Sequence, residues 1–509
     1  MVFFLSSIPI ALILFLMVGL RWGAARAGAA GYLTALAISI LFFGTGPKLL
    51  AYAHAKALLL SMDVLMIIWA AFFLYRVADE AGAIRTIGEA LPHVTNDRGM
   101  QALIIGWGFA TFLQGIGGFG VPVAVIAPIL IGLGFAPLAA VVIPSIGHGW
   151  SVTFGSLGSS FQALIASTGL PWEQLVGASA VFLGISGVFV GWMVAHAAGG
   201  FTAVRRLFWP ALVIGIVMGT TQLLVAVSGF WNIGAFIAGI AGLLVGIPLA
   251  RRYRGDQQNN GDLEWRLLLV ALSGYAAMVV IVLAVQLIPL LSDTLGKVVI
   301  QVNFPEVSTR LGYVTQAGPG RKIPLFRHAG MVLAYATMVA FFIYRGAGLY
   351  RPGALRRILG GTVRRVLAST VSIFSMVTMA VIMEHAGMTD ALARGIAEGF
   401  GSLFPLFAPW IGALGAFMTG STTNSNVVFG ALQLRTAQLL GFSAAIILAG
   451  QTAGASLASV MAPTKVVVGT STAGMSGREG DVLRRLLVYT GLMVLIISLL
   501  TVGAVWLGL

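Results

Sequence analysis

The sequence predicts an all-α protein that crosses a membrane many times. Of its 509 residues, 58% are hydrophobic and only 9% are charged, whereas about a quarter of the residues in a soluble domain carry a charge. Apolar runs of about 18 residues or more, long enough to cross the hydrocarbon core as a helix, recur along the whole chain. Cysteine is absent, which excludes disulfides, thiolate metal sites and cysteine nucleophiles.

The surplus of basic residues indicates orientation rather than a nucleic-acid partner, because Lys and Arg gather on the cytoplasmic side of membrane proteins. The chain has 30 Lys and Arg against 16 Asp and Glu. Placing Arg21, Arg76, the basic loop 251–262 and the segment 345–365 inside orders the spans without contradiction. The long segment 290–327 then lies outside, and the first apolar segment is expected to be an uncleaved span.

Two stretches of the chain resemble each other. The stretch 78–115 matches 383–420 without gaps, a shift of 305, and the match resumes with Phe135 opposite Phe442, a shift of 307. Arg76 places the end of the first copy's long span, where an Ala-Gly pair marks a turn, on the inside. The corresponding span of the second copy begins near Arg364 and therefore ends outside. The two copies therefore have opposite topology, as in transporters built from inverted repeats.

This repeat divides the chain into five predicted parts. They are N-terminal spans 1–54, a first repeat 55–198, connecting spans 199–349 with the outside loop 290–327, a second repeat 350–482, and a C-terminal span 483–509. Each repeat is expected to contain a re-entrant hairpin and a discontinuous helix, because its apolar segments are interrupted twice and many are too short to span alone.

The polar interruptions occupy matching places in the two copies. "QGIGGFGVP" (114–122) lies opposite "GSTTNSN" (420–426), and "PSIGHGWSVTFGSLGSS" (144–160) lies opposite "GQTAGASLASVMAPTK" (450–465). Nonhelical backbone at mid-membrane is tolerated only inside protein or beside a water-filled cavity, so the four interruptions must face each other. Helix N-termini, glycines and neutral donors gathered there suit a small anion.

The candidate substrate-binding residues come from these four interruptions. They are Gln114, Gly117, Gly118, Gly120, Ser145, His148, Ser421, Thr422, Thr423, Asn424, Ser425, Asn426, Gln451, Thr452, Thr464 and Lys465. Lys465 is expected to face the anion directly. The alternatives are that the hydroxyl and amide groups only cap broken helices, and that the lysine extends to lipid headgroups.

Two residues are candidates for proton coupling, and no metal site is predicted. His148 is the only histidine inside an interruption, and Asp63 is the acid most clearly within a span. His148 is equally compatible with a structural role. Asp63 lies instead near the outer interface if its span, predicted at about 55–75, begins later.

The residues around the interruptions carry a family resemblance. "GGFGVPVAVIAPILIGLGF" and, more specifically, the segment beginning "GSTTNSNVVFGALQ" (Gly420 to Gln433) resemble the L-lactate permease family of bacterial and archaeal carboxylate transporters, over most of the chain. The resemblance implies proton-coupled uptake of a small 2-hydroxy monocarboxylate, such as lactate or glycolate, across the cytoplasmic membrane of a prokaryote, with no cofactor. A broader likeness to ion transporters with paired hairpins suggests an elevator-like motion.

Other functions stay open at this point. Thr422, His148 and Lys465 depart from the family pattern toward a more positive site, which fits a more anionic acid. Sodium coupling is an alternative, because broken-helix carbonyls with hydroxyl and amide oxygens can hold a hard cation. A passive anion channel is a further alternative. An enzyme is not expected, because no acid lies near His148 to orient it. Whether two copies form a homodimer is also open.

Overall fold

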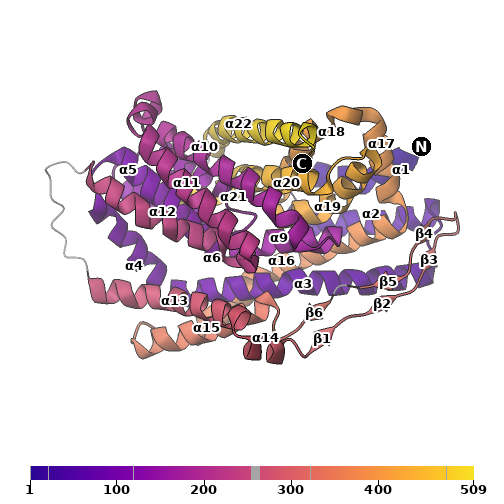
Figure 1. The fold of residues 1–509 in the computed structure, drawn as a ribbon, viewed down its shortest axis with the longest axis horizontal. Coiled ribbons are helices and arrows are strands. Elements are labelled where there is room, and N and C mark those ends of the chain that lie inside the picture. The colour runs from indigo at the N-terminus through magenta and orange to yellow at the C-terminus, as the bar shows by residue number, and fades with distance from the viewer. Residues whose placement is uncertain are drawn as a thin grey trace.

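The fold is an elongated bundle of helices (Figure 1). The computed structural model describes residues 2–20, 22–118, 120–253, 264–320, 322–476 and 478–508. In this part of the chain, eleven helices are long and apolar enough to cross a membrane. The prediction of an all-α polytopic membrane protein is therefore confirmed. Arg21 and most of the basic loop 251–262, both predicted to lie inside, fall outside the described residues.

The same order of helices occurs twice. The first unit consists of α3 (Pro47–Glu80), α4 (Ala83–Ala90), α5 (Arg98–Leu103), which continues through a π-helical turn into α6 (Ala110–Ile116), α7 (Val121–Gly132), α8 (Pro137–Gly149), α9 (Ser159–Thr168) and α10 (Trp172–Arg206). The second unit consists of α16 (Ala354–His385), α17 (Met388–Phe400), α18 (Phe404–Thr419), α19 (Thr422–Leu440), α20 (Ala444–Ala458), α21 (Pro463–Thr472) and α22 (Glu479–Trp506).

Glycines at equivalent turns confirm the register of the repeat. Gly82 and Gly387, 305 positions apart, both have left-handed backbone, with φ of 75° and 82°. Gly134 and Gly441, 307 positions apart, are likewise left-handed, at 83° and 71°. Only glycine adopts this conformation without steric cost, which is why the turns leave a mark in the sequence.

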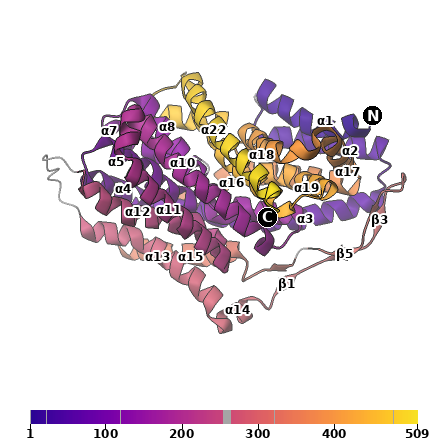
Figure 2. The same ribbon diagram turned by 45° about the horizontal axis from the view of Figure 1, so that its top comes forward.

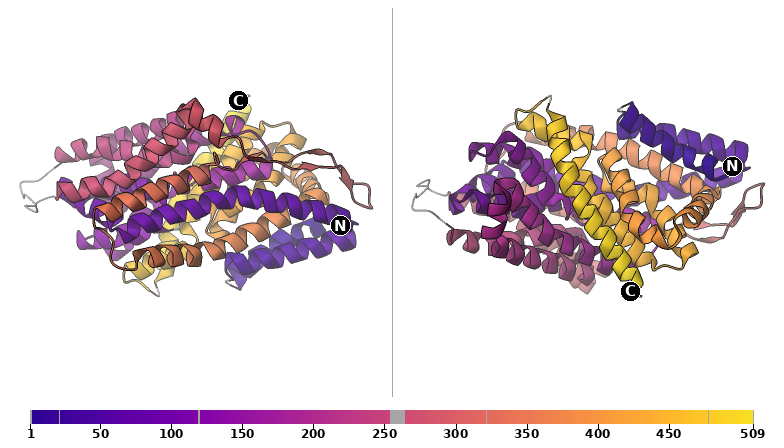
Figure 3. Two further views of the ribbon diagram at one scale, coloured as in Figure 1. Left: turned by 90° about the horizontal axis from the view of Figure 1, so that it is seen from below. Right: turned by 90° about the horizontal axis from the view of Figure 1, so that it is seen from above.

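The first helices of the two units run antiparallel along the long axis of the molecule (Figure 3). Three side-chain pairs join them along their length: Lys56 with Glu384 at 3.5 Å, Trp69 with Thr370 at 3.1 Å, and Glu80 with Arg357 at 2.7 Å. The residue numbers rise along α3 as they fall along α16, so the two units have inverted topology. We call the end with Glu80 and Arg357 the arginine end, and the end with Lys56 and Glu384 the ribbon end.

Each unit contains a hairpin and a broken helix. The first hairpin turns between α6 and α7, and the second turns at Gly420 between α18 and α19. The broken helices are α8–α9, interrupted at 150–158, and α20–α21, interrupted at 459–462. Pro463 opens α21 at a position where its missing N–H costs nothing. The Ser421 side chain caps α19 by accepting a hydrogen bond from the Asn424 N–H.

The remaining helices cover the two units. They are α1 (Val2–Leu14), α2 (Ala24–Phe42), α11 (Phe208–Val225), α12 (Gly234–Arg251), α13 (Trp265–Leu287), α14 (Pro289–Leu295) and α15 (Ala329–Gly346). Helix α22 lies across one face, between α10–α12 on one side and α17–α19 on the other (Figure 2, Figure 3).

The segment predicted as an outside loop, 290–327, contains a short helix followed by a two-stranded ribbon. Three antiparallel pairs build the ribbon: β1 (Val299–Ile300) with β6 (Ile323–Pro324), β2 (Asn303–Phe304) with β5 (Gly318–Pro319), and β3 (Val307–Ser308) with β4 (Val314–Thr315). Strands of two residues leave no alternating pattern to detect. At the tip, the Arg310 N–H donates to the Gly44 carbonyl at 2.9 Å.

Three of the predicted domain boundaries fall inside helices. The boundary 54/55 lies within α3, which begins at Pro47, the boundary 198/199 lies within α10, and the boundary 482/483 lies within α22, which begins at Glu479. In the sequence, polar residues such as Lys56 near the start of α3 look like the membrane interface at which a span begins. The helix instead continues through them.

The repeated glycine turns give a matched stability test. We expect Gly82→Ala to cost about 1 kcal/mol, because alanine is strained at positive φ. Gly387→Ala should cost clearly more, since its new Cβ would lie 2.8 Å from the Tyr313 ring in the ribbon, whereas no atom lies within 4 Å of the corresponding position at residue 82. Unfolding in detergent measures both losses. Equal losses, or a difference that persists in a Tyr313→Ala background, would contradict this packing of the ribbon on α17.

Candidate functional site

The first hairpin tip contacts both broken helices. Gly118 packs against the Ser156 hydroxyl in the first break, so closely that a Cβ atom would collide with it. Gly120 faces α21, where the nearest side chains are those of Val468 and Lys465. Glycine is needed here because both residues have positive φ and the backbone approaches its neighbours directly.

The second tip makes the equivalent contacts. Gly420 lies against Thr464 at the start of α21, with 2.7 Å between the position of a Cβ and the threonine Oγ1. Three residues later, the Thr423 hydroxyl is 3.1 Å from the Ser160 hydroxyl of α9. Both tips therefore meet the two breaks at one junction, as the requirement for buried nonhelical backbone predicts.

Five buried polar residues from the two units join at this junction, and we call them the polar seam: Thr153, Ser160, Thr423, Asn426 and Thr452. The Asn426 amide donates to the Ser160 carbonyl at 3.0 Å and to the Thr452 hydroxyl at 2.9 Å. The Thr153 and Thr452 hydroxyls are 3.0 Å apart. These bonds satisfy groups that would otherwise be costly to bury.

A cavity of about 480–490 Å³ lies on each side of the seam. The one toward the arginine end, of about 490 Å³, is lined by nine polar residues: Arg364, Arg365, Ser369, Ser372, Thr419, Ser421, Asn424, Thr464 and Lys465. No Asp or Glu is among the described residues of its wall. This cavity is therefore electropositive and rich in hydrogen-bond donors, which suits an anion.

Lys465 is the most unusual member of that wall. Its side chain is only 8% exposed, and within the described residues its ammonium has one hydrogen-bond partner, the Ser459 hydroxyl at 3.1 Å. An ammonium has three N–H donors, and a buried cation is costly unless it is paired. Beside it, the Asn424 amide donates to the Ser372 hydroxyl at 3.0 Å, while its Oδ1 is buried without a partner.

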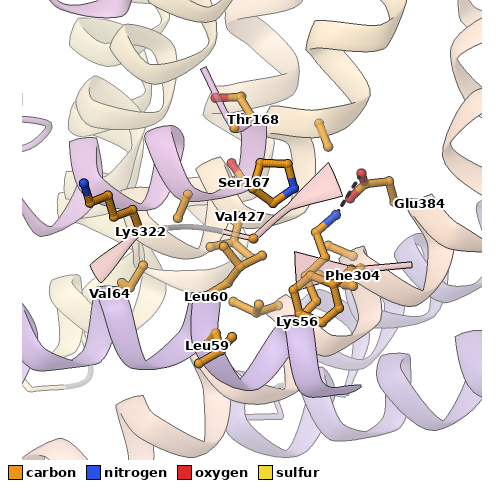
Figure 4. Close-up of a pocket in the computed structure, with 18 residues that line it drawn as sticks. Lys56, Leu59, Leu60, Val64, Ser167, Thr168, Phe304, Lys322, Glu384 and Val427 are labelled. Carbon is orange, nitrogen blue, oxygen red and sulfur yellow. Dashed lines mark hydrogen bonds and ion pairs between the residues drawn. The ribbon is translucent and has the colours of Figure 1, made fainter. Parts of the chain in front are cut away.

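The second cavity, of about 480 Å³, lies toward the ribbon end, beneath the ribbon (Figure 4). Its walls come from α3, the end of α9, α16, α19 and the ribbon. Lys56 and Glu384 form an ion pair in one wall, and Lys322 comes from the ribbon (Figure 4). Ser167, on the floor, donates to the Asn426 carbonyl at 2.9 Å, which closes this cavity against the seam.

The two cavities follow the same faces of two helices. On α19, Ser421 and Asn424 line the first cavity, and Val427 and Ala431 line the second. On α16, Ile373 lines the first cavity and Val377, one turn further along, lines the second. About one helical turn, roughly 5 Å, therefore separates the compartments.

Comparison with known proteins identifies the family. The sequence profile described as L-lactate permease matches residues 2–508. The chain belongs to the L-lactate permease family. It is 26% identical to the L-lactate permease of Bacillus subtilis over 93% of this chain and 91% of that protein, and 27% identical to the glycolate permease of Escherichia coli K12 over 86% and 83%. The family consists of permeases, so the protein is a membrane transporter and not an enzyme.

A solved structure shares the fold. The YdaH transporter of Alcanivorax borkumensis, described as having an unusual topology, superposes with a TM-score of 0.52 at 14% identity, covering 90% of this chain and 89% of that one. The overall fold of this chain is therefore shared with a solved transporter.

The structure divides the predicted binding residues of this permease into groups. Ser421, Asn424, Thr464 and Lys465 line the arginine-end cavity, with Gly120 beside the lysine. Thr423, Asn426 and Thr452 form part of the seam. The others line neither of the two cavities: Gln114, Gly117 and Gly118 at the first tip, Ser145, His148, Thr422, Ser425 and Gln451.

Several members of the third group have local roles. The His148 Nδ1 bonds the Pro144 carbonyl of its own helix at 2.6 Å, and its Nε2 is buried without a described partner. Ser145 likewise bonds the carbonyl of Val141. Ser425 bonds the Gly412 carbonyl of α18 at 2.7 Å. These contacts brace helices and hold no group at either cavity wall.

Asp63 is buried in the middle of α3, because the helix begins at Pro47 rather than near residue 55. Its Oδ1 is 2.9 Å from the His328 Nε2, and its Oδ2 accepts a hydrogen bond from the Gln162 amide at 2.7 Å. Sequence reasoning missed His328, which caps α15 by accepting a hydrogen bond from the Gly330 N–H, because histidine is not one of the residues that mark a helix N-terminus in a sequence.

Thiol labelling tests whether the two cavities open on opposite sides. The natural chain has no cysteine, so single cysteines are unambiguous reporters. Ala368→Cys lies in the arginine-end cavity and Ala431→Cys in the ribbon-end cavity. Right-side-out and inside-out vesicles expose opposite sides of the membrane. We expect a membrane-impermeant maleimide to label each cysteine in only one of the two orientations, and to label the two cysteines in opposite orientations. Ala437→Cys, at a fully buried position, is the unreactive control. Labelling of both cavities from one side would contradict the arrangement.

Proposed function

We propose that the protein is a symporter that carries a small 2-hydroxy monocarboxylate, such as lactate or glycolate, together with protons across the cytoplasmic membrane of a prokaryote. The family and its lactate and glycolate permeases support the substrate class. The arginine end is assigned to the cytoplasm, because basic residues gather there. The arginine-end cavity is then the inward-facing substrate site.

The buried Lys465 ammonium is the observation that carries this proposal. With one hydroxyl partner and a cavity free of described acids, it provides a charge-assisted hydrogen bond to a carboxylate. Ser421 and Thr464 supply hydroxyl groups beside it. The unpartnered Asn424 Oδ1 is an acceptor for the substrate's 2-hydroxyl group. Arg364 and Arg365 in the same wall are exposed, so Lys465 is the one buried cation of this wall, and an acid that binds it does not require several buried charges to be dehydrated.

Transport requires the substrate to pass the barrier between the cavities. Because one face of α19 lines both compartments opposite one face of α16, a shift of the hairpin by about one turn would transfer the bound acid from one cavity to the other. This is an elevator-like displacement of the hairpins and broken helices against α3 and α16. The seam opens and re-forms as they move.

Sodium coupling is the second candidate, and one observation favours it. The Oδ1 atoms of Asn424 and Asn426 are buried near the break without described partners, and amide oxygens are ligands for hard cations. In the described residues no group of three or more His, Asp or Glu forms a metal site, so such a cation would depend on amide, hydroxyl and carbonyl oxygens.

Uptake into proteoliposomes tests the proposal. The panel comprises lactate, glycolate, larger hydroxy acids, dicarboxylates and sulfonates, each under an imposed pH gradient or an imposed Na⁺ gradient. We expect lactate or glycolate to accumulate when the pH gradient alone is imposed. Accumulation driven only by Na⁺ would favour the second candidate. Equilibration without accumulation under either gradient would indicate a channel, and preference for a dianion would overturn the substrate class.

Removing the buried charge should weaken substrate binding. We expect Lys465→Gln to raise the Kd for lactate by about 10- to 100-fold, because a hydrogen bond to a charged group contributes roughly 1.5–3 kcal/mol. Calorimetry on the purified protein measures this. Lys297→Gln, which removes an exposed lysine between α14 and the ribbon, is the control and should bind like the wild type. Unchanged affinity in Lys465→Gln would place the site elsewhere.

The two asparagines should separate binding from gating. Asn424→Ala is expected to weaken lactate binding about tenfold, since it removes a polar group from the cavity wall. Asn426→Ala should leave affinity nearly unchanged and instead lower the free energy of unfolding by roughly 1–3 kcal/mol, because it leaves seam partners unpaired. Parallel calorimetry and unfolding curves check both. The reverse assignment would show that the substrate binds in the seam.

A further inference from the structure

A long apolar groove lies on the outside of the bundle, where α3 runs between α15 and α16 (Figure 1). Its volume is about 670 Å³, and none of the described residues that line it is charged. Along α3 it extends from Leu58 to Phe73, which is about 22 Å of helix. This exceeds the roughly 15 Å depth of one leaflet of the hydrocarbon core.

The groove offers hydrocarbon rather than hydrogen bonds to a ligand. The Thr362 and Thr370 hydroxyls bond carbonyls of their own helix at 2.8 and 2.9 Å. On the floor, the Trp69 indole N–H donates to the Thr370 hydroxyl at 3.1 Å. Leu58 and Val363 are about half exposed, at 57% and 48%. The groove therefore opens to the surroundings of the protein, which in a membrane are lipid chains.

The two walls of the groove each continue into an arginine. On α16, Arg356 lies seven positions from Val363, which lines the groove, and seven positions are about two turns. On α15, Arg345 lies eleven positions, about three turns, from Ala334. Helix α15 ends beside the end of α3, where the Tyr350 hydroxyl donates to an α3 carbonyl. We call Arg345 and Arg356, both exposed at the arginine end, the groove arginines.

The acids at this end of α3 are already paired. Asp79 is 2.9 Å from Arg76, and Glu80 is 2.7 Å from Arg357. Within the described part of the chain, neither groove arginine has an ion pair of its own. The end of the groove therefore carries two positive charges in excess, at the depth where lipid headgroups lie.

We propose that the groove binds an anionic phospholipid, with one acyl chain over Trp69 and the phosphate on the groove arginines. This inference goes beyond the proposed transport function and does not depend on it. The planar guanidinium of arginine can donate two parallel hydrogen bonds to phosphate oxygens. Basic pockets between membrane-spanning helices bind anionic headgroups in this way. A lipid bound there contacts α3, α15 and α16 together.

Tryptophan quenching tests the site directly. The purified full-length protein, in a non-ionic detergent, is titrated with phosphatidylglycerol that has brominated acyl chains, which quench nearby indole fluorescence. Brominated phosphatidylcholine, whose headgroup has no net charge, is the comparison lipid. We expect a saturable component of quenching by phosphatidylglycerol alone. This component should be absent in Trp69→Phe, although ten of the eleven tryptophans remain.

Two further variants separate the headgroup from the groove. The double variant Arg345→Gln, Arg356→Gln should raise the Kd for phosphatidylglycerol by about 10- to 30-fold, because each basic residue near an anionic lipid contributes roughly fivefold. The double variant Arg484→Gln, Arg485→Gln removes the same charge from exposed positions on α22 and should bind like the wild type. Ala334→Phe keeps both groove arginines but narrows the groove, and it should weaken the saturable quenching by tenfold or more.

Each contrary result overturns the inference. Equal saturable quenching by the two lipids, or an unchanged Kd in the groove-arginine variant, would show that the headgroup is not recognised. An equal loss in the α22 control would indicate a general effect of charge. Saturable quenching that persists in Trp69→Phe would place the chain elsewhere. If the wild type shows none and elutes as a dimer, a second copy covers the groove instead.

Discussion

The bilayer imposes the constraint on which this structure depends: backbone that leaves the helical path at mid-membrane must find its hydrogen-bond partners inside the protein. Four segments break in this chain, two in each unit. Each break finds its partners in the others, through contacts such as Thr423 with Ser160 and Gly420 with Thr464. The polar seam is thus the structural solution for the broken helices. Along α19, the seam residue Asn426 lies between Asn424 of the arginine-end cavity and Val427 of the ribbon-end cavity.

In the proposed function, the same junction is where a strongly apolar protein binds an anion. A lysine buried beside helix breaks is costly when unpaired, and an incoming carboxylate lowers that cost. Neutral hydroxyl and amide groups complete the site without a fixed acid that would compete for the lysine.

Much of this architecture could be predicted from the sequence, because helix breaks require particular residues. Left-handed turns need glycine at Gly82 and Gly387, and the hairpin tips need glycines and hydroxyl groups, so the repeat and the four interruptions are visible in one chain. The direction in which each side chain of a helix points is not visible in the sequence. Asn424 and Ser425 are neighbours, yet a rotation of about 100° directs one to the cavity and the other to α18. His328 and the ribbon depended on tertiary contacts, since neither has a local pattern.

The most direct measurement is a cross-link between the two units. The Ser160 and Thr423 hydroxyl oxygens are 3.1 Å apart, so the double variant Ser160→Cys, Thr423→Cys should form a disulfide on mild oxidation in membranes, in a chain that has no other cysteine. We expect rapid cross-linking that blocks transport, and no cross-link when Ser425→Cys replaces Thr423→Cys, because that side chain faces α18. Failure of the first pair to cross-link, or equal cross-linking of both pairs, would contradict the convergence of the two units at one seam.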